Sequence, residues 1–165
     1  MVMNTRALDR AEAVSETRVR TLVVDDSPFM LKILTQILEA AGDFDLVGTA
    51  TNGRQALGHV SMLSPDLVLM DIHMPGLNGV QVTRSIKQSE HSPVVILASS
   101  DDSSVTKTTA EEAGADAFVS KEGNLRNQLM GALQDLFGPG SEKPEAVGIS
   151  FQNKLAGYSK QDHGT

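Results

Sequence analysis

The residues best suited to chemistry in this sequence are three aspartates that follow two apolar segments. Asp25 and Asp26 come directly after the run 21–24, and Asp71 comes directly after the run 66–70. Three carboxylates at close range repel one another and take up protons unless a cation compensates them. Mg²⁺ suits such a group, because it binds carboxylate and phosphate oxygens. An aspartate can also act as a nucleophile, so the three aspartates predict a Mg²⁺ site beside a residue that accepts a phosphoryl group.

Two further polar side chains occupy similar positions after other apolar segments. Ser99 follows the run 94–97, and Lys121 follows the run 117–119. Phosphoryl transfer depends mostly on placement and charge neutralisation, so a hydroxyl donor and a second cation fit a site that forms an acyl phosphate. Ala98 stands closer to its run than Ser99, but alanine cannot donate a hydrogen bond, and we therefore prefer Ser99. Each residue alone would suit a turn, a cap or a solvated surface; their joint occurrence favours one site.

The segments between the apolar runs have the residue spacing of helices that pack against a sheet. In the first of them, Ser27 and Pro28 are the residue types of a helix N-cap and of the first helical position, and Gly42 is typical of a C-cap. The apolar residues between them recur on one helix face. They are Met30, Ile33, Leu34, Ile37, Leu38 and Ala41. The same reasoning predicts strands at 21–24, 46–50, 66–70, 94–97 and 117–119, each followed by a helix.

Five short, almost wholly apolar strands that alternate with five helices predict an α/β fold with a parallel sheet covered on both faces. Right-handed crossovers leave few topologies, and an alternation of this length suits a flavodoxin-like, doubly wound sheet in the order 2-1-3-4-5 that is known from such folds. The strands that precede Asp26 and Asp71 are then neighbours where the strand order reverses. Ligands bind at this point in open α/β sheets, so the polar residues are expected to meet in one crevice.

The net charge of −7 indicates which partners the chain can take. Acidic and basic residues balance in 1–19 and in 139–165, so the excess of acid lies in 20–138. An acidic domain is not suited to binding the phosphate backbone of a nucleic acid.

The chain has no cysteine, which excludes disulfides and thiolate metal sites. Its first residues lack the apolar run that is typical of a signal peptide, and no stretch approaches the roughly 20 apolar residues that cross a membrane. We expect a cytoplasmic protein without nucleic-acid or membrane partners.

Composition also divides the chain into three parts. Residues 1–19 form a polar extension, 20–138 carry the alternating pattern, and 139–165 are rich in Gly, Ser, Lys and Gln. Both ends are predicted to be flexible. The 27 residues after Gly138 are too few for a DNA-binding or catalytic domain. We therefore expect any output to pass through a partner protein.

Several motifs resemble the receiver domain of two-component response regulators over about residues 20–138. They are Val23-Val24-Asp25-Asp26-Ser27, Asp71-Ile72-His73-Met74-Pro75 with Gly79, and Ala113-Gly114-Ala115-Asp116-Ala117-Phe118 followed by Lys121. The stretch Asp-Asp-Ser-Pro-Phe-Met from Asp25 is similar to chemotaxis-type receivers, including those of methylesterase regulators. The segment from Val47 to Gly53 shares this likeness.

The resemblance implies a role for each matching residue. Asp71 would accept phosphate from a histidine of a sensor kinase. Asp26, Asp71 and the backbone carbonyl of His73 would bind Mg²⁺ directly, and Asp25 would act through water. The family therefore implies Mg²⁺ as the cofactor and a sensor histidine kinase as the first partner.

The resemblance also implies a switch. Ser99 would move toward the phosphoryl group, Lys121 would pair with it, and Phe118 would be the aromatic residue that follows this shift. The helix expected near 104–113 has a thin apolar face and is the predicted mobile element. The chain departs from the family in two places: Glu122 follows the lysine where most relatives have proline, and the switch aromatic lacks a hydroxyl.

The expected function is a phosphorylation-dependent switch of a two-component or chemotaxis pathway. Its output would be binding to a protein such as the flagellar motor switch or another kinase, and a phosphate sink or a phosphorelay intermediate is the alternative. The chain is expected to be no enzyme beyond self-phosphorylation and slow autodephosphorylation, and to be a monomer or a weak dimer.

Two rival functions are less consistent with the residues. An aspartyl-nucleophile phosphatase usually has a second aspartate two positions after the first, and His73 stands there. A flavin-binding protein of the same fold needs a hydroxyl-rich phosphate loop after its first strand. Asp25 and Asp26 stand in that loop here, and their charges would repel a phosphate.

Overall fold

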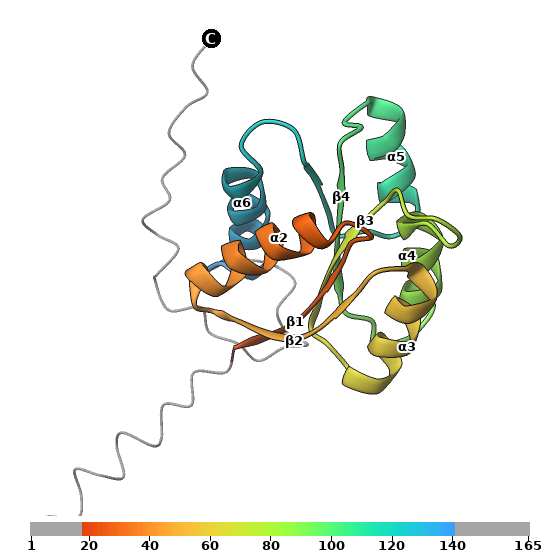
Figure 1. The fold of residues 1–165 in the computed structure, drawn as a ribbon, viewed down its shortest axis with the longest axis horizontal. Helices are drawn as coiled ribbons and strands as arrows, with labels where there is room; N and C mark the ends of the chain where they lie inside the picture. The colour runs from red at the N-terminus through yellow and green to blue at the C-terminus, as the bar shows by residue number, and fades with distance from the viewer. Residues whose placement is uncertain (1–17, 141–165) are drawn as a thin grey trace, which may run out of the picture.

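The structure is a computed structural model, and it describes residues 18–140 of the chain (Figure 1). The described strands are β1 (Val19–Val24), β2 (Phe44–Ala50), β3 (Leu67–Asp71), β4 (Val94–Ser99) and β5 (Ala117–Ser120). The described helices are α2 (Pro28–Ala41), α3 (Gly53–Leu63), α4 (Gly79–Lys87), α5 (Ser104–Glu112) and α6 (Leu125–Phe137). The extensions predicted to be flexible are residues 1–19 and 139–165. Only residues 18, 19, 139 and 140 of them lie within the described part of the chain.

The strands form one parallel sheet in the order β2-β1-β3-β4-β5. The flavodoxin-like fold and the order 2-1-3-4-5 predicted from the sequence are therefore confirmed. Helices α2 and α6 cover one face of the sheet, and α3, α4 and α5 cover the other (Figure 1). β1 and β3 are neighbours, so the strands that lead to Asp26 and Asp71 lie side by side.

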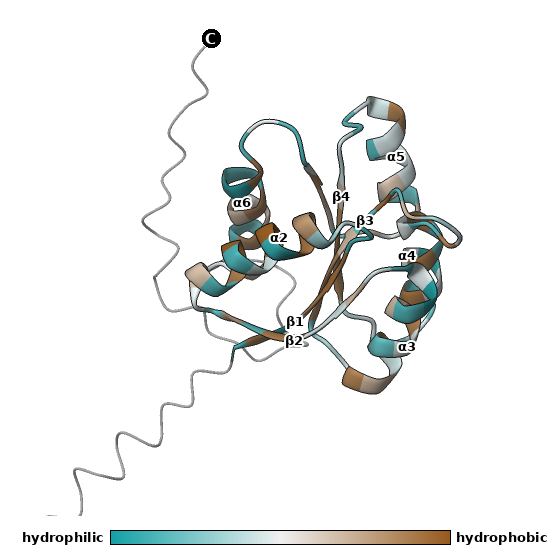
Figure 2. Cartoon of the chain, in the orientation of Figure 1, coloured by the Kyte–Doolittle hydropathy of each residue, from teal (hydrophilic) through white to brown (hydrophobic). Residues whose placement is uncertain are grey.

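The sheet is buried because it carries apolar side chains on both faces, and its central strands are the most apolar part of the ribbon (Figure 2). One core cluster packs β1, β3 and β4 against α2 and α6, and the other packs the opposite sides of these strands against α3, α4 and α5. Every residue of β3 is buried. β3 is the middle strand of the sheet, with apolar clusters on both of its sides.

Helix α2 begins and ends where its capping residues predict. Ser27 is the N-cap, and its hydroxyl accepts a hydrogen bond from Met30 N–H at 3.3 Å. Pro28 opens the helix, and Gly42 adopts the left-handed conformation with φ of 79° at the C-cap. These local hydrogen bonds are set by residue type, which explains why the sequence located this helix well.

The strands extend beyond their predicted limits. β1 begins at Val19, one residue before the predicted domain boundary, because Val19 pairs with Phe44 of β2. β3 includes Asp71 and β4 includes Ser99, through pairing with Ala98 and Ser120 respectively. Backbone pairing with the neighbouring strand rather than residue type sets these limits. Asp71 and Ser99 are therefore the last residues of strands and not the first residues of loops.

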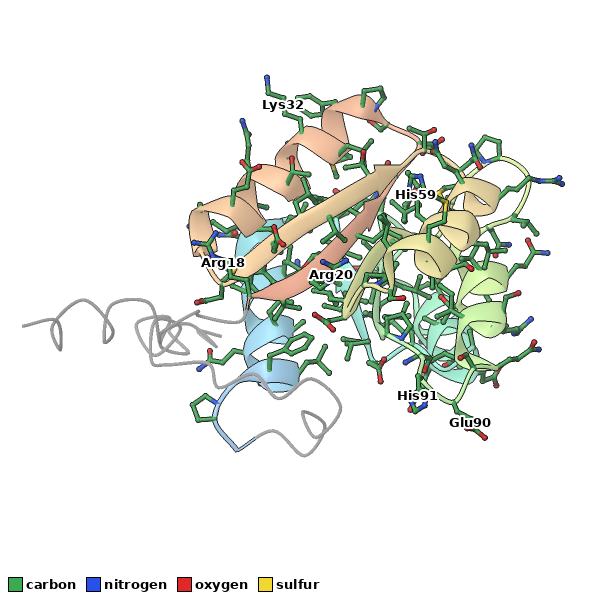
Figure 3. The ribbon with its side chains drawn as sticks, turned by 90° about the horizontal axis from the view of Figure 1, so that it is seen from below. Arg18, Arg20, Lys32, His59, Glu90 and His91 are labelled. Carbon is green, nitrogen blue, oxygen red and sulfur yellow. The ribbon has the colours of Figure 1, made fainter. Side chains whose placement is uncertain are left out.

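The end of the sheet opposite to Asp71 is closed by polar contacts of Arg20. The Arg20 side chain donates to the carbonyl of Leu63 at 2.7 Å, and its backbone N–H donates to Asp66 at 2.9 Å. Figure 3 shows Arg20 beside β1. Among the described residues, no helix has the length and apolar character needed to cross a membrane.

Candidate functional site

Asp71 ends β3 and is buried, with 5% of its surface exposed. The backbone beyond it is held by two hydrogen bonds, from Ile72 N–H to the Ala98 carbonyl at 2.9 Å and from Gly79 N–H to the Ile72 carbonyl at 2.8 Å. A Cβ at Gly79 would overlap the carbonyl oxygen of Asp71. Glycine at this position therefore lets the start of α4 pack directly behind the end of β3.

Asp25 is oriented by its own loop and is 1% exposed. Its N–H donates to the Ala50 carbonyl at 3.1 Å, and its Oδ1 accepts a hydrogen bond from Ser27 N–H at 2.9 Å. This contact from an aspartate to the N–H two residues later is a common turn, which is one of the roles that the sequence left open for a single aspartate. It leaves Oδ2 directed at other groups of the site.

The three predicted aspartates do meet. Carboxylate oxygens of Asp25, Asp26 and Asp71 all lie within 4.8 Å of one another, with Asp25 and Asp71 buried and Asp26 exposed. Oxygen ligands on two buried carboxylates and one exposed carboxylate fit a Mg²⁺ ion that keeps some water. The residues present therefore fit the cofactor that the sequence predicts.

Lys121 lies between the two buried carboxylates. Its Nζ is 2.6 Å from Asp25 Oδ2 and 2.9 Å from Asp71 Oδ1. Burial alone would lower the pKa of Lys121, but its hydrogen bonds to Asp25 and Asp71 and their charges together raise it. The lysine is therefore a fixed positive charge at the acceptor carboxylate.

Burial raises the pKa of Asp71, and the charge of Asp25 adds to this effect. The Lys121 ammonium and a backbone hydrogen bond from His73 act in the opposite direction without overcoming it. One lysine faces two buried carboxylates and Asp26, so negative charge is in excess. A cation that neutralises this excess would keep Asp71 ionised and able to act as a nucleophile.

Ser99 is fully buried at the end of β4, whereas Ser100 is exposed. The Ser99 hydroxyl accepts a hydrogen bond from Asp101 N–H at 3.0 Å. The backbone carbonyl of Ser99 accepts one from Lys121 N–H at 2.9 Å. The residue paired with Asp71 across the strands is Ala98, which has no hydroxyl. Ser99 is therefore the buried hydroxyl at this strand end, although the structure pairs it with its own loop.

The remaining predicted residues lie at the edge of the site. The side chain of His73 is exposed, and the ligand role of its carbonyl stays a prediction. Phe118 is half-buried in β5 and packs against the core under α4 and α5, with Lys107 Nζ 6.0 Å from its ring centroid. His59 on α3 and His91 after α4 lie apart from one another (Figure 3).

The chain matches one known domain family over most of its described residues. The profile of the response regulator receiver domain matches residues 21–134, which is more than half of the chain. The chain belongs to this receiver family. As in the sequence prediction, the match covers the segment with the five strands.

Several curated relatives of this chain share one name. The chain is 35% identical over 117 residues to a protein-glutamate methylesterase/protein-glutamine glutaminase of Halobacterium salinarum, covering 70% of this chain and 33% of that protein. It is 42% identical over 113 residues to a protein with the same name from Myxococcus xanthus, covering 68% and 32%. The receiver therefore spans about a third of the length of these relatives.

Solved structures agree on the fold. The receiver domain of the regulator NarL from Mycobacterium tuberculosis matches with a TM-score of 0.67 and 31% identity, over 72% of this chain and 94% of that one. The response regulator domain of CheB from Thermotoga maritima matches with 0.59 and 34%, over 64% and 79%. A CheX–CheY–BeF₃–Mg complex from Borrelia burgdorferi matches with 0.66 and 27%, over 72% and 89%.

Proposed function

We propose that this receiver is a phosphorylation switch that accepts a phosphoryl group on Asp71. The observation that supports this best is the contact of the Lys121 ammonium, on a side chain that is 9% exposed, with two buried aspartates at 2.6 and 2.9 Å. This arrangement places a fixed positive charge beside one carboxylate oxygen of Asp71. The same charge would neutralise a phosphoryl oxygen bonded to that residue.

The transfer itself needs few groups. An oxygen of the Asp71 carboxylate forms a bond to phosphorus while the phosphorus–nitrogen bond of a phosphohistidine breaks, and the histidine nitrogen keeps the electron pair. When bound, Mg²⁺ supplies charge neutralisation for the phosphoryl oxygens. Asp25 and Asp26 would hold it with Asp71, as their clustered oxygens permit. Lys121, which contacts an oxygen of Asp71, would also stabilise the added charge.

The proposed switch uses the hydroxyl of Ser99, which is paired with its own loop in this structure. Ser99 accepts from Asp101 N–H, and a hydroxyl can also donate one hydrogen bond. A phosphoryl group on Asp71 adds negative charge and would attract that donor away from the loop before α5. We propose that the rearrangement changes α5 and the neighbouring strand β5, where Phe118 lies half-buried.

The output is proposed to be protein binding. The curated relatives carry a methylesterase name, and the Borrelia burgdorferi relative is a CheY in complex with CheX. We propose that this chain likewise takes phosphate from a sensor histidine kinase in the cytoplasm and signals through a protein of a chemotaxis-type pathway. Beyond its own phosphorylation and slow dephosphorylation, it is proposed to catalyse no reaction. A phosphate sink would show phosphorylation without phosphorylation-dependent binding.

The test is labelling of the full chain with acetyl phosphate and Mg²⁺, followed by intact-mass measurement. We expect the mass of one phosphoryl group on the wild type and none on Asp71→Asn. The exposed Asp45→Asn variant on β2 is the control and should label like the wild type. Labelling of Asp71→Asn at the wild-type level would refute the assignment. Capture of partners with and without beryllofluoride would then separate a switch from a sink.

A further inference from the structure

One side chain of α6 holds the loop that carries Lys121 on both sides of the lysine. Gln128 Oε1 accepts a hydrogen bond from Ser120 N–H at 3.0 Å, and Gln128 Nε2 donates to the Glu122 carbonyl at 2.9 Å. We call these two contacts the Gln128 bridge. The bridge fixes the residues immediately before and after Lys121, so it restrains the backbone from which the lysine side chain extends.

Two backbone N–H groups complete the restraint. Glu122 N–H donates to Ser120 Oγ at 3.1 Å, and Lys121 N–H donates to the Ser99 carbonyl at 2.9 Å. Residues 120–122 include no proline that would fix the backbone by itself. The conformation of this loop therefore depends on hydrogen bonds, and the Gln128 bridge supplies the side-chain contacts that reach it from α6.

The position of the Lys121 ammonium determines its contacts with the two buried carboxylates. Lys121 Nζ contacts Asp25 and Asp71 in a site where its side chain is 9% exposed. A lysine side chain has several rotatable bonds, so the position of its ammonium depends on where its backbone is held. Gln128 is on the outer surface of α6 and is not among the residues that contact the carboxylates.

We propose that Gln128 is a positioning residue for Lys121, which it holds so that the ammonium meets the acceptor oxygen and the phosphoryl group. The inference rests on the proposed function of Asp71. Gln128 acts through the lysine and touches no reacting atom. Because Gln128 is largely exposed, water competes for its hydrogen bonds, and the effect of losing them is moderate.

The test measures beryllofluoride affinity in the presence of Mg²⁺, and Mg²⁺ affinity alone, by calorimetry on the full chain. Gln128→Met keeps length and helix propensity but loses both contacts of the bridge. We expect it to bind beryllofluoride about three- to tenfold more weakly. Its Mg²⁺ affinity should stay equal or rise, because Lys121 competes with the cation for Asp25 and Asp71. Gln134→Met, the same change on the same helix outside the bridge, should behave like the wild type.

A double-mutant cycle separates positioning from general damage. In a Lys121→Ala background, Gln128→Met should cause no further loss of beryllofluoride affinity. Wild-type affinity in Gln128→Met, an equal loss of Mg²⁺ and beryllofluoride affinity, or an undiminished loss in the Lys121→Ala background would each overturn the inference while leaving the proposed function intact. A wild-type chain that binds no beryllofluoride would overturn the proposed function, and this inference with it.

Discussion

The charge balance around Asp71 governs both reactivity and stability at this residue. Asp71 is 5% exposed, and burial raises its pKa despite the nearby Lys121 ammonium. A carboxyl group whose pKa is raised on folding makes the folded state more stable in its protonated form than in its ionised form. An ionised Asp71 at neutral pH therefore lowers the free energy of unfolding of the protein.

The first prediction follows from this cost. Asp71→Asn removes the buried charge while keeping a similar shape, so we expect its free energy of unfolding at pH 7 to exceed that of the wild type by about 1 kcal/mol. Urea unfolding without Mg²⁺ measures the difference. Asp26→Asn, at an exposed position of the same cluster, should change stability by less than about 0.5 kcal/mol.

The second prediction concerns the pH dependence of that difference. The wild type gains the stability of a neutral Asp71 as the pH falls through the raised pKa of the folded state, and the gain is complete below the unfolded value of 3.8. The advantage of Asp71→Asn should therefore shrink as the solution is acidified. Unfolding curves of both proteins from neutral to acidic pH measure it, and an advantage that grew toward acid would contradict the sign argued here.

At the scale of elements, the position of Asp71 depends on the close packing of α4 behind β3. A Cβ at Gly79 would overlap the Asp71 carbonyl oxygen and lie 3.0 Å from Ile72 Cα. These are backbone atoms of the last residue of β3 and of the residue that follows it, so they cannot yield as a flexible side chain could. Glycine at the start of α4 is therefore a structural requirement of the site.

The third prediction is that Gly79→Ala destabilises the protein by about 1–3 kcal/mol, through overpacking against the strand. Gly58→Ala on α3 is the matched control, because nothing lies within 4 Å of a Cβ built there. That variant should gain about 0.5–1 kcal/mol from the higher helix propensity of alanine. Thermal unfolding of both variants tests this, and equal effects of the two would show that packing at Gly79 is not limiting.

Helix α5 is the element with the least support from the core. Ala110 is its only buried residue among those described, and Val105 is 74% exposed. Its first turn is held instead by polar contacts, with Thr106 Oγ1 donating to Asp101 at 2.6 Å. Few apolar contacts make an element easy to shift, and the Ser99 hydroxyl lies at the start of the same loop.

The fourth prediction is that amide exchange changes most within residues 100–121 when Mg²⁺ and beryllofluoride bind. The reason is that Ser99 must leave Asp101 N–H to reach the phosphoryl mimic, which alters the loop before α5. Exchange measured with Mg²⁺ alone provides the reference. Unchanged exchange in this segment, with change elsewhere, would exclude α5 as the switch element.

At the scale of the whole molecule, folding brings together aspartates from β3 and from the loop after β1. A cation that binds this cluster binds the folded chain and not the unfolded one, so it stabilises the protein by mass action. The net charge of −7 also makes any salt stabilise the chain slightly by screening. A specific effect of Mg²⁺ must therefore exceed that of a monovalent salt at equal ionic strength.

The fifth prediction is that Mg²⁺ at about a hundred times its dissociation constant raises the free energy of unfolding by about 2.7 kcal/mol. Asp26→Asn should lose most of this gain, because it removes one ligand from an exposed position without disturbing the core. Urea unfolding in Mg²⁺ and in potassium chloride of equal ionic strength provides the measurement. An equal gain in both salts would mean that the cluster binds no Mg²⁺ specifically.

The amino-acid pattern alone was enough to obtain the sheet order, the helix caps and the group of site residues. Helix caps such as Ser27 and Gly42 depend on contacts within a few residues. The strand order is one of the few that right-handed crossovers allow for an alternation of this length. The meeting of Asp25, Asp71 and Lys121 followed from that order. In each case the information is local, or it is a general property of parallel sheets.

Tertiary structure decided the strand limits, the orientation of Ser99 and the support of Lys121. Backbone pairing with neighbouring strands carried β3 through Asp71 and β4 through Ser99. The Ser99 hydroxyl has several possible partners within its own loop, and only the folded geometry selects Asp101 N–H. The contacts of Gln128 with the residues on either side of Lys121 depend on how α6 packs beside β5. No spacing rule in the sequence specifies such a contact, because it joins side-chain and backbone atoms of different elements.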